Sequence, residues 1–105
     1  MKAAIKVDFG KGLRLGVGKV RLLEMVAETG SISAAARRME MSYRRAWLLI
    51  DELNEIFHIA VVETAAGGSG GGGAKITPHG KKVIAVFQQL QIEADALVAA
   101  KFSQF

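Results

Sequence analysis

The chain has 105 residues, of which 50% are hydrophobic and 23% charged, and it contains no cysteine. This length suits one domain, and the composition is that of a globular chain. The missing cysteine excludes disulfides and thiolate metal sites. The formal net charge of +4 is uneven, because residues 1–47 carry +6 and residues 48–105 carry −2. A basic half suits a polyanionic partner, although charge alone favours an ordinary solvated surface.

Two features of the sequence bear on its location. No continuous apolar run approaches the roughly 18 residues that a membrane span requires. Residues 1–5 are followed too soon by Lys6 and Asp8 to form the core of a signal peptide. We therefore expect a soluble, cytoplasmic protein that has no membrane partner.

Residues 5–9 alternate apolar and polar side chains, which predicts a short N-terminal strand. A turn-rich stretch with Leu13 and Leu15 as apolar anchors follows. Four glycines mark this stretch: Gly10, Gly12, Gly16 and Gly18. From about Lys19 the apolar spacing becomes helical, and Gly30 stands where a helix C-terminal cap is expected.

Two more helices follow, joined by a short turn. Either Ser31 or Ser33 can cap the first, and Ser42 can cap the second, which extends to about Phe57. Between the two caps, three alanines allow a neighbouring helix to approach closely. The predicted buried stripe of the second helix comprises Ala46, Ile50, Leu53 and Phe57. Residues 31–57 therefore predict a helix-turn-helix.

Residues 59–64 and 75–77 are predicted to form two short strands on either side of the glycine-rich segment 67–73. Thr77 and Pro78 then begin a long last helix, as its cap and first residue. Its apolar seam comprises Val83, Phe87, Leu90, Ala94 and Leu97. This seam could pack on the chain's own core. Together with its apolar neighbours, however, it is wider than a small body needs, so we expect a contact with a second chain.

The helix-turn-helix carries the strongest functional signal. Its second helix can enter the major groove of DNA, where residues near the helix start meet base edges. Here those residues are Ser42, Tyr43, Arg44 and Arg45, with Trp47 one turn beyond Tyr43. Arginine can donate two hydrogen bonds to guanine O6 and N7. Trp47 also borders the buried stripe, which favours helix packing over base contact.

Helix pairs of this kind also arise by chance in helical proteins, so the helix-turn-helix alone is weak evidence for DNA binding. The predicted hairpin strengthens the DNA-binding interpretation. A helix-turn-helix followed by a two-stranded wing and another helix is a winged helix. The wing glycines, among them Gly70 and Gly71, leave backbone N–H groups open to phosphate, although a linker without any contact is equally compatible. No phosphate-binding loop is present, because Ala74 and Ile76 flank Lys75.

The stretches 28–39 and 41–47 resemble the N-terminal DNA-binding domain of the molybdate-responsive (ModE-type) regulators, in a stand-alone form. The stretch 62–74 and the following Thr77-Pro78 resemble the same family's wing and dimerisation helix. LysR-type regulators are a more distant resemblance. The resemblance implies a winged-helix homodimer that binds double-stranded operator DNA. The candidate DNA-binding residues are Ser33, Arg37, Arg38, Ser42, Tyr43, Arg44, Arg45, Trp47, Gly70, Gly71 and Lys75.

Two departures from the family pattern stand out. Glu40 occupies a turn position at which relatives usually have glycine, so we expect a strained or differently shaped turn. Full-length members also continue into molybdate-binding domains, so we expect no molybdate or other effector site within these residues. Arg37 and Arg38 can also be explained as solvated charges in the last turn of their helix, where the dipole favours cations.

We therefore predict a mainly α (α+β) winged helix-turn-helix in a single domain. Its parts are the helix-turn-helix at 31–57, the wing at 59–77 and a dimerisation helix at 78–102. The predicted function is that of a homodimeric transcriptional regulator, not an enzyme, without a cofactor or metal, since His58 and His79 are isolated. The alternative is a protein-interaction or adaptor module without its own operator. A small-molecule sensor ranks third.

Overall fold

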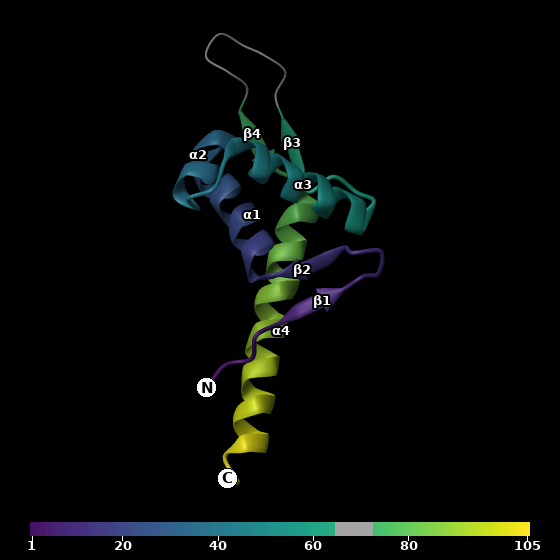
Figure 1. Ribbon diagram of the computed structural model, residues 1–105. Coiled ribbons are helices and arrows are strands. Elements are labelled where there is room, and N and C mark those ends of the chain that lie inside the picture. The colour runs from purple at the N-terminus through teal and green to yellow at the C-terminus, as the bar shows by residue number, and fades with distance from the viewer. Residues whose placement is uncertain (65–72) are drawn as a thin grey trace.

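The computed structural model describes residues 1–64 and 73–105, and within them it has four helices and two antiparallel strand pairs (Figure 1). Helices α1 to α3 gather around the first half of α4, and the second half of α4 extends beyond this body. The elements are β1 (Lys6–Asp8), β2 (Arg14–Gly16), α1 (Val17–Thr29), α2 (Ile32–Arg38), α3 (Tyr43–Phe57), β3 (Val62–Thr64), β4 (Ala74–Ile76) and α4 (Pro78–Phe102). The predicted winged helix with a long last helix is confirmed.

Side-chain caps begin three of the helices where the sequence predicted them. Ser31, and not Ser33, accepts a hydrogen bond from the N–H of Ala34 at the start of α2. Ser42 caps α3 in the same way. Thr77 caps α4, with Pro78 as its first residue. Each cap satisfies one backbone donor that would otherwise have no partner, and this fixes where the helix begins.

The N-terminal region contains one strand more than the sequence predicted. The stretch predicted as turns contains β2, which pairs with β1 through the register Val7 to Leu15. Helix α1 follows directly at Val17, earlier than the predicted Lys19. Both differences have one cause, which is that Leu15 is buried against the core and pairs with Val7. This pairing fixes the strand β2, and a strand of three residues is too short for alternating apolar and polar side chains to be recognised in the sequence.

The core lies where α1, α2 and α3 meet. Helix α1 contributes Leu22, Leu23 and Val26, and the small residues Ala35 and Ala36 of α2 let the helices approach closely. The predicted stripe of α3 is buried except for the half-buried Phe57, and Leu49 and Ile56 widen it. The first half of α4 completes the core with Val83 and Phe87, which are 6% and 5% exposed.

A hydrogen-bonded junction around Val61 joins α3, the wing and α4. The side chain of Asn54 on α3 accepts a bond from the N–H of Val61 at 2.9 Å. The carbonyl of Val61 accepts from the N–H of Thr77 at 3.1 Å, and the Thr77 hydroxyl donates to the carbonyl of Ala60 at 2.7 Å. A Cβ at Gly80 would collide with the Val61 carbonyl oxygen, so only glycine allows α4 to start this close.

The turn between α2 and α3 places Glu40 in the left-handed backbone region, with φ +54°. The chain turns tightly here, because the N–H of Glu40 bonds to the carbonyl of Arg37 and that of Met41 to the carbonyl of Ala36. A side chain in this conformation costs roughly 1–2 kcal/mol. A strained or differently shaped turn was expected at this position, because Glu40 stands where relatives of the resembled family usually have glycine.

We expect Glu40→Gly to raise the free energy of unfolding by about 0.5–1 kcal/mol, because glycine removes the backbone strain of the left-handed conformation. Glycine also increases the conformational entropy of the unfolded chain, and this offsets part of the stabilisation. Chemical denaturation measures the change. Glu40→Gln removes the same charge but keeps the strain, so it should leave stability nearly unchanged. A glycine variant no more stable than the glutamine variant would show that the turn is unstrained.

Candidate nucleic-acid interface

Helix α3 turns one row of side chains to solvent along its length. Arg44 and Leu48, one turn apart, begin this row, and Asp51 and Glu55 continue it. Leu48 is 50% exposed, so this row presents one large apolar side chain to solvent. The first half of the exposed face therefore offers a cation and an apolar group, whereas the second half offers only carboxylates.

Tyr43 and Trp47 flank this row on one side of the helix. Their rings meet edge to face, with centroids 6.2 Å apart. Tyr43 is 55% exposed, and Trp47 is half-buried against the core. Trp47 therefore acts first as a packing residue, and its ring holds the tyrosine ring in an outward position.

Helix α2 contributes a second set of exposed polar groups. Arg37 donates from Nη1 to the Ser33 hydroxyl at 3.1 Å, so the two side chains are held together on the surface. Arg38 pairs with Glu28 of α1 at 3.0 Å, and both side chains are more than half exposed. This ion pair partly neutralises Arg38, so Arg37 is the freer of the two cations for an external anion.

In the wing, Lys75 is exposed on β4 and lies opposite Glu63 of β3 in the strand register. The N–H of Ala74 donates to the carbonyl of Gly30 at 2.9 Å, which ties the wing to the start of the helix-turn-helix. Gly70 and Gly71, which the sequence assigned to the wing tip, lie outside the described residues.

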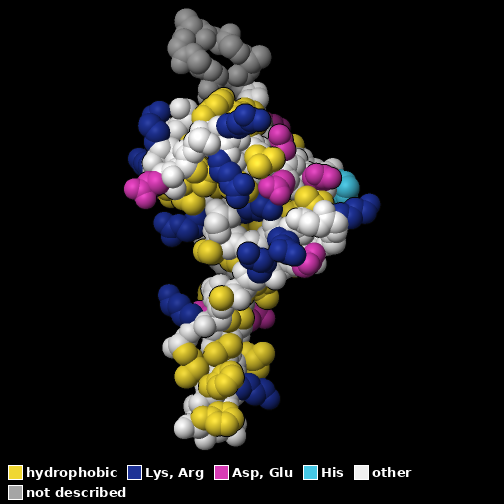
Figure 2. Space-filling view, in the orientation of Figure 1, with side chains coloured by type: hydrophobic (Ala, Val, Ile, Leu, Met, Phe, Trp, Pro, Cys, Tyr) yellow, Lys and Arg dark blue, Asp and Glu magenta, His cyan; other side chains and the backbone are white. Residues whose placement is uncertain are grey.

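Charged and apolar side chains are unevenly distributed over the face of the molecule that Figure 2 shows. In that view, basic side chains are spread over the body formed by α1 to α3 and the β1–β2 hairpin, with acidic side chains among them. Hydrophobic side chains dominate the protruding half of α4. The two regions therefore suit different partners, one anionic and one apolar.

The two histidines have different surroundings. His58 caps α3 with φ +57° and is exposed. His79 packs edge to face on Phe57, with ring centroids 5.6 Å apart. Within residues 1–64 and 73–105, no three His, Asp or Glu side chains gather closely enough to hold a metal ion.

The sequence-predicted residues Ser42, Tyr43, Arg44 and Arg45 thus share the exposed start of α3. Two features of this surface were missed. Leu48 follows Arg44 by four residues, a spacing that places both on one face of the helix but does not say whether that face is covered. The β1–β2 hairpin was missed because its second strand is short, although Arg14 between two leucines was a visible signal.

Comparison with known proteins gives a family match and a fold match. Residues 17–81 match the family described as bacterial regulatory helix-turn-helix protein, lysR family. Among the solved structures that share the fold are two that match most of this chain. One is VV2_1132, a LysR family transcriptional regulator, with a TM-score of 0.62 and 19% identity over 86% of this chain and 29% of that one. The other is ArgP from Mycobacterium tuberculosis, with a TM-score of 0.56 and 21% identity over 80% and 30% of the two chains.

Curated relatives are similar at higher identity. The molybdenum-pterin-binding protein MopB of Rhodobacter capsulatus is 40% identical over 85% of this chain and 33% of its own length. The molybdenum transport protein ModE of Azotobacter vinelandii is 36% identical over 87% and 34%. The DNA-binding transcriptional dual regulator ModE of Escherichia coli (strain K12) is 40% identical over 74% and 30%. The chain spans about a third of the length of these relatives.

Proposed function

Since this chain belongs to the bacterial regulatory helix-turn-helix proteins of the lysR family, we propose that it is a sequence-specific DNA-binding transcriptional regulator. The observation that carries the proposal is the exposed start of α3, where Tyr43, Arg44 and Arg45 surround a helix N-terminus held clear of the core. A helix in this position can enter the major groove and meet base edges.

Arg44 and Leu48 are the proposed base-reading pair. The Arg44 guanidinium can donate two hydrogen bonds to the O6 and N7 atoms of guanine, and Leu48, one turn on, can contact a thymine methyl group. Asp51 and Glu55 would repel phosphates from the second half of α3. This distribution of charge supports a docking in which only the first half of the helix lies deep in the groove.

Phosphate contacts are assigned to the flanking elements. Ser33 and Arg37 on α2 and Lys75 on the wing are exposed and carry donors that suit phosphate oxygens. Such contacts fix the orientation of the protein without reading sequence. We accordingly propose the division of the chain that the sequence predicted: a helix-turn-helix (31–57), a wing (59–77) and a last helix (78–102). We also propose that the protein acts in the bacterial cytoplasm.

The alternative function, a protein-interaction module, would need a largely uncharged aromatic and aliphatic surface at the start of α3. Leu48 fits that description, but the two arginines beside it do not. The balance of these side chains favours DNA.

Several relatives are named for molybdenum, yet the chain matches only about a third of their length. We therefore assign no effector site to residues 1–105.

We further propose that α4 mediates a homodimer. Val86, Leu90, Ala94 and Leu97 recur on one side of the helix at spacings of four, four and three residues. Three of them are conspicuously exposed: Val86 is 59%, Leu90 38% and Leu97 60% exposed. Val83 and Phe87, which the sequence also assigned to the dimer contact, are instead part of this chain's core, so Val86 replaces them in the proposed interface.

An apolar groove continues this stripe onto the body. It has a volume of about 370 Å³ and is lined by Phe9, Phe57, Val86 and Leu90, among others. A second copy presents the same stripe, so a two-fold pair buries both stripes at once.

By length and composition alone α4 could also cross a membrane. Its first turns, however, pack in the core, and Asp95 near its middle accepts a hydrogen bond from the N–H of Ala3 at 2.8 Å.

The first test concerns DNA binding itself. Duplexes retained by the wild-type protein from a random-sequence pool should share a motif, because base contacts specify sequence. Their affinity should fall steeply with salt, with a log–log slope of about −0.9 for each phosphate neutralised. Filter binding over a salt series measures this slope. Failure to retain any duplex at low salt would remove the proposed function.

The second test compares one base-reading residue with one phosphate-binding residue. Arg44→Ala should cost about 1–3 kcal/mol on the selected duplex and relax the preference at one base position. Lys75→Ala should weaken all duplexes nearly alike, because a phosphate contact carries no base information. Titration against single-base variants of the duplex separates the two effects. Equal, sequence-independent losses would move the specificity to Tyr43, Arg45, Leu48 or DNA shape.

The third test concerns the dimer. Leu90→Asp should raise the dissociation constant of the dimer at least about tenfold, or about 1.4 kcal/mol, because it places a charge in an apolar contact. Sedimentation over a concentration series measures the change. Ile92→Asp is the matched control, since Ile92 is 62% exposed and lies about 200° around the helix from Leu90.

An unchanged dimer in Leu90→Asp, together with a weakened one in Ile92→Asp, would move the interface to the other side of α4. A wild-type protein that stays monomeric at high concentration would remove the dimer. Partition of that monomer into lipid vesicles would then identify a membrane as the partner of the apolar helix.

A further inference from the structure

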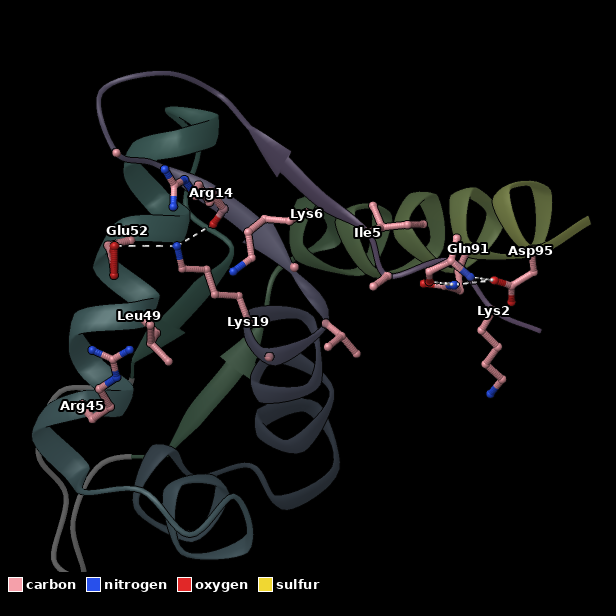
Figure 3. A pocket seen from close by; sticks show the side chains of 16 residues that line it. Lys2, Ile5, Lys6, Arg14, Lys19, Arg45, Leu49, Glu52, Gln91 and Asp95 are labelled. Carbon is pink, nitrogen blue, oxygen red and sulfur yellow. Dashed lines mark hydrogen bonds and ion pairs between the residues drawn. The ribbon is translucent and has the colours of Figure 1, made fainter. Parts of the chain in front are cut away.

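A broad groove lies beside α3, between the β1–β2 hairpin, the start of α1 and the N-terminal segment (Figure 3). Its volume is about 780 Å³. Five cationic side chains line it: Lys2, Lys6, Arg14, Lys19 and Arg45. Only two carboxylates, Glu52 and Asp95, accompany them. The groove therefore carries an excess of three positive charges.

The hairpin creates one wall of this groove by simple alternation. Val7 and Leu15 turn toward the core, so Lys6 and Arg14, their neighbours in the two strands, project to the other side. In Figure 3 both side chains point into the space beside α3, from which Arg45 approaches. Two segments far apart in the sequence thus bring their cations to one surface.

The carboxylates of the groove are already engaged. Glu52 lies 3.6 Å from the ammonium of Lys19, whose side chain is only 12% exposed and also donates to the carbonyl of Arg14. Asp95 accepts hydrogen bonds from the N–H of Ala3 and the amide of Gln91, and these hold its pKa below the ordinary value. Glu52 is therefore paired with Lys19, whereas Asp95 is held by two neutral donors and keeps its charge, which Lys2 lies near enough to influence.

The remaining cations are open to an external anion. Within the described residues, Lys2, Lys6 and Arg45 have no carboxylate oxygen within 4.0 Å. Arg14 lies 3.7 Å from Asp8, but both side chains are more than half exposed, so water screens this pair and a competing anion can replace it. Four cations are thus distributed along the groove rather than around one point.

This spread favours a polyanion over a small anion. Lys2 lies near α4 at one end of the groove and Arg45 on α3 at the other, as Figure 3 shows, so one phosphate group could not contact both. Successive phosphates of a nucleic acid backbone could, because they follow one another along a line. Arg45 is also the sequence neighbour of Arg44, so the groove begins where the proposed base-reading surface ends.

We propose that this groove binds backbone phosphates of the DNA that flanks the segment read by α3, with Lys6 and Arg14 of the hairpin as the principal contacts. The inference rests on the proposed DNA-binding function and adds a second, sequence-independent contact surface to it. The N-terminal hairpin then extends the footprint beyond the helix-turn-helix and the wing. Lys2 and Arg45 are placed to contact phosphates at the two ends of the groove.

The test compares two double variants of the whole chain that remove equal charge. Lys6→Gln/Arg14→Gln removes the cations of the hairpin wall, whereas Arg21→Gln/Lys81→Gln removes two exposed charges of α1 and α4 that line neither this groove nor the apolar groove of the proposed dimer. Each is titrated with the duplex selected by the wild type, once with about one helical turn of flanking DNA (about 10 base pairs) and once without it. Sedimentation first establishes that both variants have the wild-type oligomeric state.

On the long duplex, the hairpin variant should bind roughly tenfold to thirtyfold more weakly, and its salt slope should be shallower by about 1.8 for each bound chain, for two lost phosphate contacts. On the short duplex it should equal the wild type. The control variant should resemble the wild type on both. Lys6→Arg/Arg14→Lys keeps the charges and should restore affinity, which distinguishes lost contacts from a misfolded hairpin.

Equal affinities of the two glutamine variants for the long duplex would overturn the inference and leave the proposed function intact. A loss of the same size on the short duplex would also overturn it, because the cations would then contact DNA beneath α3. A wild-type protein that binds neither duplex would instead remove the proposed function. Failure of the inference and failure of the function are thus distinguishable.

Discussion

The hydrogen-bonded junction around Val61 is the constraint on which the arrangement of the functional parts depends. The amide and carbonyl of this one residue are bound by Asn54 of α3 and Thr77 at the start of α4, and both groups lie in the protein interior. Since a buried amide or carbonyl is costly to leave unpaired, the junction resists rearrangement. Gly80 then brings α4 against it. The proposed reading helix, wing and dimerisation helix are therefore held in one fixed relation.

This rigidity lets a small chain assign separate tasks to separate surfaces. The start of α3 carries arginines and a tyrosine, the hairpin carries Lys6 and Arg14, which point into the space beside α3 (Figure 3), and the protruding half of α4 is largely apolar (Figure 2). The two carboxylates that line the basic groove, Glu52 and Asp95, bind groups of the chain itself. Electrostatic attraction and apolar association therefore act through different residues, since the basic groove and the apolar groove share no lining residue.

Much of the interface could be predicted because its signals are local. The caps Ser31, Ser42 and Thr77 fix helix starts through hydrogen bonds to residues only three positions away. The exposed start of α3 followed from these boundaries. Leu48 and the hairpin cations did not follow. The exposure of Leu48 depends on which face of α3 the other helices cover, and the approach of Lys6 and Arg14 to Arg45 depends on contacts far apart in the sequence.

The sequence by itself determined the order of the elements from α1 onward, the residues at which three helices begin and the winged helix-turn-helix, and the family resemblance drew attention to the turn at Glu40. Only the tertiary structure decided which part of the α4 seam is buried within the chain, since helical periodicity groups Val83, Phe87 and Leu90 on one face without saying what covers them. It likewise decided that β2 exists and that a basic groove lies beside α3. In each case the deciding contact joins residues of different elements, and the pattern within one element does not say which other element covers it.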